Sequence, residues 1–236
     1  MPRLIAAIAV VAVLAASCSS GGGGSKTPTP APTPAPFTAD RAKALIDGAL
    51  LTPVDLPGSG WTVGSDTTQD NAAAAAADPT SAASIARCGR LLGRTVTHSP
   101  ANIVTAFIGG ETVAFFSQIT VYATDAGATD CAAEAATRLQ QPGQLARAFG
   151  KLFIDPDKVV VAPVTFPPTG DGSFAATLAE QVSAQGTTVD LTLLVVGFRK
   201  GNVTAVVGSA SNGTPSLTEL TPLVGTVLGR IDAARK

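Results

Sequence analysis

The chain has 236 residues, of which 45% are hydrophobic and 14% are charged, and its formal net charge is −1. Its Lys and Arg residues do not cluster and the net field is weak, so the composition argues against binding to nucleic acid or to an anionic membrane surface. Aromatic residues make up 5%, with one Trp, one Tyr and one His. Recognition of sugars or bases by stacking therefore has few side chains available.

The first residues have the pattern of an export signal. Arg3 carries a positive charge, and residues 4–16 contain no polar side chain. This run is too short to span a bilayer, which takes about 20 residues, but it suits the apolar core of a signal peptide. It ends in LAASC, which resembles the bacterial lipobox, with Ala15 where Leu is usual. We predict a signal peptide over 1–17 and an acylated Cys18 that anchors the protein to the cell membrane; ordinary secretion with a free thiol is the alternative.

Residues 18–36 have the composition of a linker. Gly and Ser fill 19–25, and Pro alternates with Thr or Ala in 27–36. The first part is a flexible coil, and the second is expected to form an extended polyproline II segment that projects the following domain by about 30 Å. Such a spacer suits a protein held at one end. Residues 37–236 have the length of one domain, which we place on the extracytoplasmic side of the membrane.

Within this domain, Thr38 can cap a helix over 39–50. The segment 51–61 is rich in Pro and Gly and is expected to be irregular. The alanines of 72–77 have no large side chain to bury, so they are predicted to form a short exposed stretch. A second helix is predicted over 81–92 from its apolar spacing.

Strands and further helices fill the rest of the chain. The Gly pair at 109–110 is predicted to join two strands in a hairpin. Ser216 and Glu219 have the spacing of a capping box for the last helix. Pro222 favours a kink in this helix or a start near Thr221. The predicted strands cover 103–108, 112–123, 159–166, 174–183, 187–199 and 203–209, and the predicted helices among them cover 126–140 and 144–153.

This order of elements predicts an α+β fold. Strands that follow one another in hairpins form an antiparallel sheet, and we expect the helices to pack mainly on one face of it in a single domain. The order lacks the βαβ alternation of a Rossmann-type sheet, which is therefore disfavoured.

Two cysteines, Cys88 and Cys131, fall on apolar stripes of predicted helices. Thiols oxidise outside the cytoplasm, and two cysteines allow one pairing, so we predict a Cys88–Cys131 disulfide that joins the two helices. Two buried, reduced cysteines are the alternative. A metal site needs more ligands than the domain offers, and no cofactor is expected.

Groups for catalysis are few. His98 is the only histidine and is interpreted as a solvated residue in a Thr-His-Ser-Pro loop. The Gly-Ser-Gly at 58–60 is not a nucleophile elbow, because it does not join a strand to a helix. The acidic residues of 155–157 and Asp171 are interpreted as turn residues. Trp61 is interpreted as a core or rim anchor, with the lining of a cleft as the alternative.

Several motifs together resemble a known family. They are LTPVDLP at 51–57 followed by a tryptophan, a cysteine at 88, a hairpin and a helix that carries Cys131, a Gly-Asp turn at 170–171, and FRKGNV at 198–203. This pattern resembles the PknH-like extracellular sensor domain of bacterial membrane serine/threonine kinases, which also occurs in stand-alone lipoproteins. The resemblance implies an α+β fold, a cleft for a ligand and no enzymatic activity. Kinase-linked members have two disulfides, whereas this domain can form one, and no kinase segment is present.

The sequence therefore predicts a non-catalytic ligand-binding or sensor-like domain on a lipid anchor. Its expected partners are the membrane, through Cys18, and a small apolar ligand or an envelope protein, with no nucleic acid. A structural or protein-interaction lipoprotein of the cell envelope is the alternative. A hydrolase with a site made of carboxylates alone is the least favoured interpretation.

Overall fold

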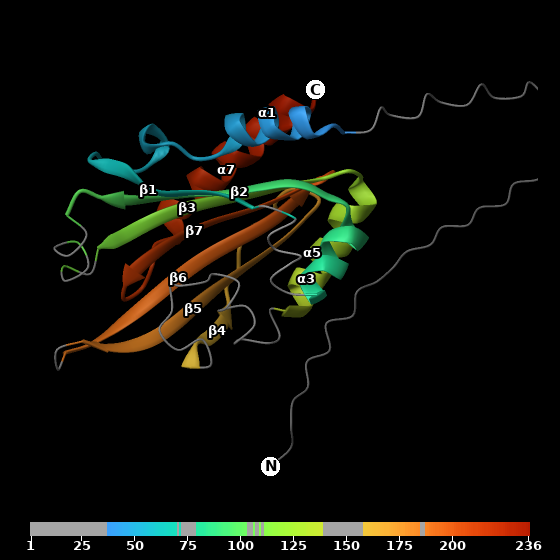
Figure 1. The fold of residues 1–236 in the computed structure, drawn as a ribbon. Helices are drawn as coiled ribbons and strands as arrows, with labels where there is room; N and C mark the ends of the chain where they lie inside the picture. Colours follow the sequence, from blue (N-terminus) through green and yellow to red (C-terminus); the bar gives the residue numbers. More distant parts are fainter. Residues whose placement is uncertain are drawn as a thin grey trace, which may run out of the picture. The chain divides into compact units, whose positions relative to one another are not determined.

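The computed structural model describes residues 37–69, 71, 79–102, 106, 109, 111–138, 158–184 and 187–236 (Figure 1). They belong to one compact unit, Ala35–Lys236. The predicted signal peptide, Cys18, the linker, the alanines of 72–77 and the predicted helix 144–153 lie outside the described residues. In the described part of the chain, no helix is long and apolar enough to cross a membrane.

Seven antiparallel strands form one sheet in the order β1-β2-β3-β7-β6-β5-β4. The strands are β1 Trp61–Gln69, β2 Arg90–Pro100, β3 Thr112–Tyr122, β4 Val160–Pro163, β5 Gly172–Ala184, β6 Thr187–Lys200 and β7 Val203–Asn212. The helices are α1 Ala39–Ala49, the short 3₁₀ helix η1 Pro53–Asp55, α3 Pro79–Cys88, α5 Asp125–Arg138 and α7 Leu217–Arg235. The predicted α+β class with an antiparallel sheet is confirmed.

Helix α1 forms where the sequence predicts it. The Thr38 side chain accepts a hydrogen bond from the Arg41 amide at 3.2 Å, which satisfies one of the free N–H groups of the first turn. Its buried residues recur at helical spacing and face the sheet: Ala42, Leu45, Ile46 and Ala49. Each large aliphatic side chain buried in this way contributes about 1.5–3 kcal/mol relative to exposure.

Helix α7 packs beside α1 on the same face of the sheet (Figure 1). Ser216 caps it by accepting from the Glu219 amide, and the helix then runs from Leu217 through Pro222, so the predicted start near Thr221 is wrong. At this position Pro222 removes the N–H that would otherwise bond to the Thr218 carbonyl. Together with the sheet, the two helices enclose the main core, which includes Phe115, Ile119, Leu194, Val196, Leu220, Val224, Val227 and Ile231.

The other face of the sheet carries a second apolar layer. Side chains that alternate with those of the main core form it, as the two-residue period of a strand requires. Its buried members include Phe116, Ala176, Leu178, Leu193 and Val195. Helices α3 and α5 pack against each other, and α5 contacts β3, β7 and β6 (Figure 1).

The structure corrects the prediction for residues 61–108. Trp61–Gln69 is strand β1, where an irregular segment was expected to end at Trp61. The predicted helix 81–92 ends at Cys88, and Arg90–Pro100 is strand β2. Strand β2 pairs with β3, the place that the prediction gave to residues 103–108. Of residues 103–108 the structure describes only Ala106, which is helical. The predicted strand 159–166 is shorter, at Val160–Pro163.

Candidate functional site

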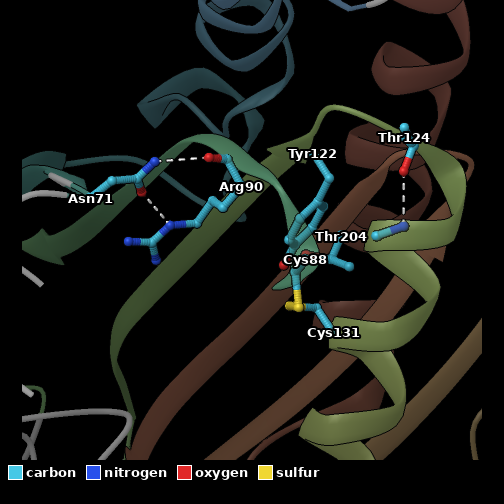
Figure 2. The surroundings of a disulfide bond; sticks show 8 residues. Asn71, Cys88, Arg90, Tyr122, Thr124, Cys131 and Thr204 are labelled. Carbon is cyan, nitrogen blue, oxygen red and sulfur yellow. Dashed lines mark hydrogen bonds between the residues drawn. A yellow bond between two sulfur atoms is a disulfide. The ribbon is translucent and has the colours of Figure 1, made fainter. Parts of the chain in front are cut away.

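The disulfide joins Cys88, the last residue of α3, to Cys131 in the middle of α5 (Figure 2). The two Cα atoms are 5.8 Å apart. Gly89 has a φ of 60°, a left-handed conformation that ends α3 and lets the chain turn into β2. Gly127 is required for the close approach of α5, because a Cβ atom there would lie 2.1 Å from the Cys88 carbonyl oxygen.

Tyr122 lies at the centre of this corner. It belongs to a small buried cluster with Cys88 and Ala128, and its hydroxyl is 3.3 Å from the Thr204 hydroxyl on β7 (Figure 2). The backbone is held as well, since the Tyr122 amide donates to the Asn202 carbonyl at 2.9 Å. The end of β3, the start of β7 and the disulfide-linked helices are therefore joined at this corner.

Arg90 leaves this unit two residues after Cys88. Its Nε donates to Oδ1 of Asn71 at 2.6 Å, and the Asn71 amide nitrogen donates back to the Arg90 carbonyl oxygen at 2.8 Å (Figure 2). One terminal nitrogen donates to Oε1 of Gln69 at 3.1 Å. Gly93 makes room for this contact, because a Cβ atom there would lie 2.3 Å from the same Gln69 oxygen.

The charge of Arg90 has no acidic neighbour among the described residues. Both of its side-chain acceptors are neutral carboxamides, and its second terminal nitrogen is buried without a hydrogen-bond acceptor. Burial lowers the pKa of Arg90, and the proximity of Tyr122 partly offsets this effect. By contrast, Arg94 pairs with Asp66 at 2.5 Å. A part-buried guanidinium without a counter-charge is therefore a distinctive feature of this corner.

No family model matches the sequence. No curated protein matches it either. Among solved structures, the chain is similar to the crystal structure of the extracellular domain of PknH from Mycobacterium tuberculosis, with 12% identity over 84% of this chain and 98% of that chain, and a TM-score of 0.44. At this level of similarity, the function of the chain has to be argued from its own residues.

The prediction that His98 is a solvated loop residue is wrong. His98 lies in β2 and is 0% exposed, and its Nε2 donates to the Leu51 carbonyl at 3.0 Å. Nδ1 has no hydrogen-bond partner in the described part of the chain. Ser117 accepts from the Leu51 amide at 3.0 Å, so both polar groups of Leu51 are bound by side chains of the sheet. In this position His98 fixes the segment between α1 and η1 against the core.

The other residues singled out in the sequence lie apart from one another. Trp61 packs edge-on against Phe115, with ring centroids 4.9 Å apart, and its indole N–H donates to the Pro57 carbonyl at 2.7 Å. Asp171 occupies a turn, as predicted, and accepts from the Gly201 amide at 2.6 Å, which joins this turn to the one between β6 and β7. Residues 155–157 lie outside the described residues. Within the described ranges, no group of three or more His, Cys, Asp or Glu could hold a metal ion.

The sequence prediction missed the contacts of Arg90. Gln69, Asn71 and Arg90 meet because β1 pairs with β2 in the register that places Gln69 opposite Gly93. A register cannot be read from residue types when neither strand is predicted. The one local signal is Gly93, since a glycine inside a strand often marks the close approach of another group.

Proposed function

We propose that the protein is a lipoprotein anchored at Cys18, with an extracytoplasmic α+β domain that works by binding and not by catalysis. Three features in succession support this proposal: an apolar signal-like run that ends in LAASC, a Gly/Ser and Thr/Pro linker, and a domain with a disulfide. Each suits a protein that is exported and then held at the membrane by its N-terminus.

The use of the three cysteines carries this proposal. Cys88 and Cys131 are bonded to each other, which leaves Cys18 as the odd cysteine of the chain. An unpaired thiol in an oxidising compartment is open to oxidation and to intermolecular pairing. Acylation removes that hazard and gives the cysteine at the end of LAASC a function.

The titratable groups of the domain favour binding over acid–base catalysis. A general acid or base works best with a pKa near the operating pH. The hydrogen bond from Arg94 lowers the pKa of Asp66, and the hydrogen bond from the Gly201 amide lowers the pKa of Asp171. These carboxylates stay ionised at neutral pH, and the buried His98 is bound to a backbone carbonyl.

The anchor is tested by Cys18→Ala in the full chain. The variant is expected to move from the membrane fraction to the soluble or secreted fraction and to lose labelling by an alkyne fatty acid. Ser17→Ala, which keeps a small residue before the cysteine, is the matched control and should stay in the membrane. An unaltered distribution of Cys18→Ala between the fractions would refute the anchor.

Binding is tested separately by native mass spectrometry of the protein extracted from its own membrane. We expect a retained adduct beyond the mass of the acylated chain. A screen with ester, peptide and glycoside substrates covers the hydrolase alternative. Robust turnover that is lost in a folded His98 variant would contradict a non-catalytic domain.

A further inference from the structure

We propose that Arg90 anchors a binding site for an oxyanion, the carboxylate or phosphate group of the domain's ligand. This inference rests on the proposed binding function and names the chemical class that the site recognises. The site consists of Arg90 with the two carboxamides that hold it. Asn71 lies beside Arg90 near the disulfide (Figure 2), and Gln69 accepts from a terminal nitrogen of Arg90.

Several N–H donors of the Arg90 guanidinium are not used in hydrogen bonds with the residues that hold it. An arginine side chain has five N–H donors. One of them is used by Asn71 and one by Gln69, which leaves three for another acceptor. Two of those three belong to the terminal nitrogen that is buried without a partner. The third belongs to the other terminal nitrogen, and one N–H from each of the two terminal nitrogens forms the parallel pair that matches the two oxygens of a carboxylate or phosphate.

A buried charge without a counter-charge is costly to a fold, and proteins ordinarily pair it. This chain does pair its other part-buried arginines. Arg94 binds Asp66, and Arg230 binds Asp55 at 2.7 Å. Arg90 is held instead by groups that orient it without neutralising it. An unneutralised, oriented cation is what an anionic ligand requires.

The surroundings of Arg90 are organised before any ligand arrives. Asn71 bonds to the side chain and to the backbone of Arg90, so the side chain has little rotational freedom left. Gly93 lets the Gln69 carboxamide lie against the strand. The disulfide at Cys88 fixes the chain two residues before Arg90. Preorganisation of this kind lowers the entropy that is lost on binding.

The experiment titrates the detergent-solubilised full chain with sodium phosphate, sodium acetate and sodium octanoate at constant ionic strength, followed by calorimetry. At least one anion is expected to bind saturably. Tighter binding of phosphate than of acetate identifies a phosphate ester as the ligand class, and tighter binding of octanoate than of acetate identifies a carboxylate with an apolar tail. Because the protein is in detergent, the result does not depend on whether Cys18 is acylated.

Two arginines three residues apart supply the variant and its control. Arg90→Gln is expected to weaken anion binding about tenfold or more, the loss expected when charge-assisted hydrogen bonds are removed. Arg87→Gln removes the same charge from an exposed position on α3 and should bind like the wild type. Asn71→Ala keeps the charge but releases the orientation of Arg90, so it should also bind more weakly; it serves as the test if Arg90→Gln does not fold.

Absence of saturable binding by the wild type for all three anions would overturn the proposal, as would equal losses in Arg87→Gln and Arg90→Gln. A retained uncharged adduct in native mass spectrometry, together with no anion binding, would leave the proposed binding function in place and remove the oxyanion site alone. The two failures are therefore distinguishable.

Discussion

Reduction of the Cys88–Cys131 bond is expected to destabilise the domain strongly. The two cysteines are 43 residues apart in the sequence, and the chain-entropy model assigns about 4 kcal/mol to a loop of this length. This figure is an upper value, because a denatured chain that is already compact loses less entropy when it is closed. Small domains have about 5–15 kcal/mol of stability in total, so the bond accounts for a large share.

The assay is urea denaturation of the full chain with and without reductant, followed by tryptophan fluorescence. Trp61 packs against the core residue Phe115, so its emission reports on the main core and not on the disulfide corner. Reduction should lower the midpoint and raise the slope of the transition, since the reduced denatured chain exposes more surface. Non-reducing peptide mapping establishes first that the bond is present.

The matched control is the double variant Cys88→Ala/Cys131→Ala. Like the reduced wild type it lacks the cross-link, and its midpoint should not respond to reductant. Its own packing loss at Cys88, which is 1% exposed, adds to the entropic term, so a midpoint below that of the reduced wild type is expected. A loss of less than about 1 kcal/mol on reduction, or two free thiols in the folded protein, would refute the reasoning.

Two further substitutions test the packing and the charges. Gly127→Ala should lower the free energy of unfolding by about 1–3 kcal/mol or more, because the new Cβ would meet a backbone oxygen. Gly48→Ala in α1 is the control: its Cβ would meet nothing, so it should stabilise the helix slightly. The urea midpoints of the two variants test both expectations. Burial raises the pKa of Asp55, but hydrogen bonds from Arg230 and Thr52 outweigh burial and lower it. The ion pair between Asp55 and Arg230 therefore stabilises the fold fully above the unfolded pKa of about 3.9. This stability is lost as the pH falls through the lower pKa of the folded state. Asp55→Asn should cost about 2 kcal/mol at pH 7 and should flatten the loss of stability below pH 4; an unaltered acid profile would contradict this assignment.

The parts of the fold that were predictable carry strong local signals. In α1, a capping Thr38 precedes apolar residues at helical spacing, and each of them is buried. In β6 and β7, runs of Val, Leu and Ala are separated by a short turn at 201–202. Here local propensity and tertiary packing favour the same structure, which is the condition under which sequence patterns are reliable.

Strands β1 and β2 lacked such signals. β1 is an edge strand whose residues are mostly exposed, so its sequence is polar and resembles a loop. In β2, buried Val96 and His98 alternate with half-buried threonines, which is the two-residue period of a strand. The pattern is hard to recognise in the sequence because a histidine, and not an apolar residue, occupies a core position. The apolar spacing of the preceding helix also continues past Gly89, where the left-handed conformation ends it.

The composition of the chain bears on the ligand proposed for Arg90. The low charge of the chain is compatible with an apolar or neutral ligand, and the proposed site at Arg90 would add a directional contact for an acid group. One charged contact within an apolar surrounding is the usual arrangement in small-molecule sites, where polar groups fix orientation and apolar contact gives affinity. A ligand that meets both requirements would be an amphipathic acid. Tighter binding of octanoate than of acetate, and its loss in Arg90→Gln, would support both requirements; equal binding of the two carboxylates would keep the oxyanion site and remove the apolar one.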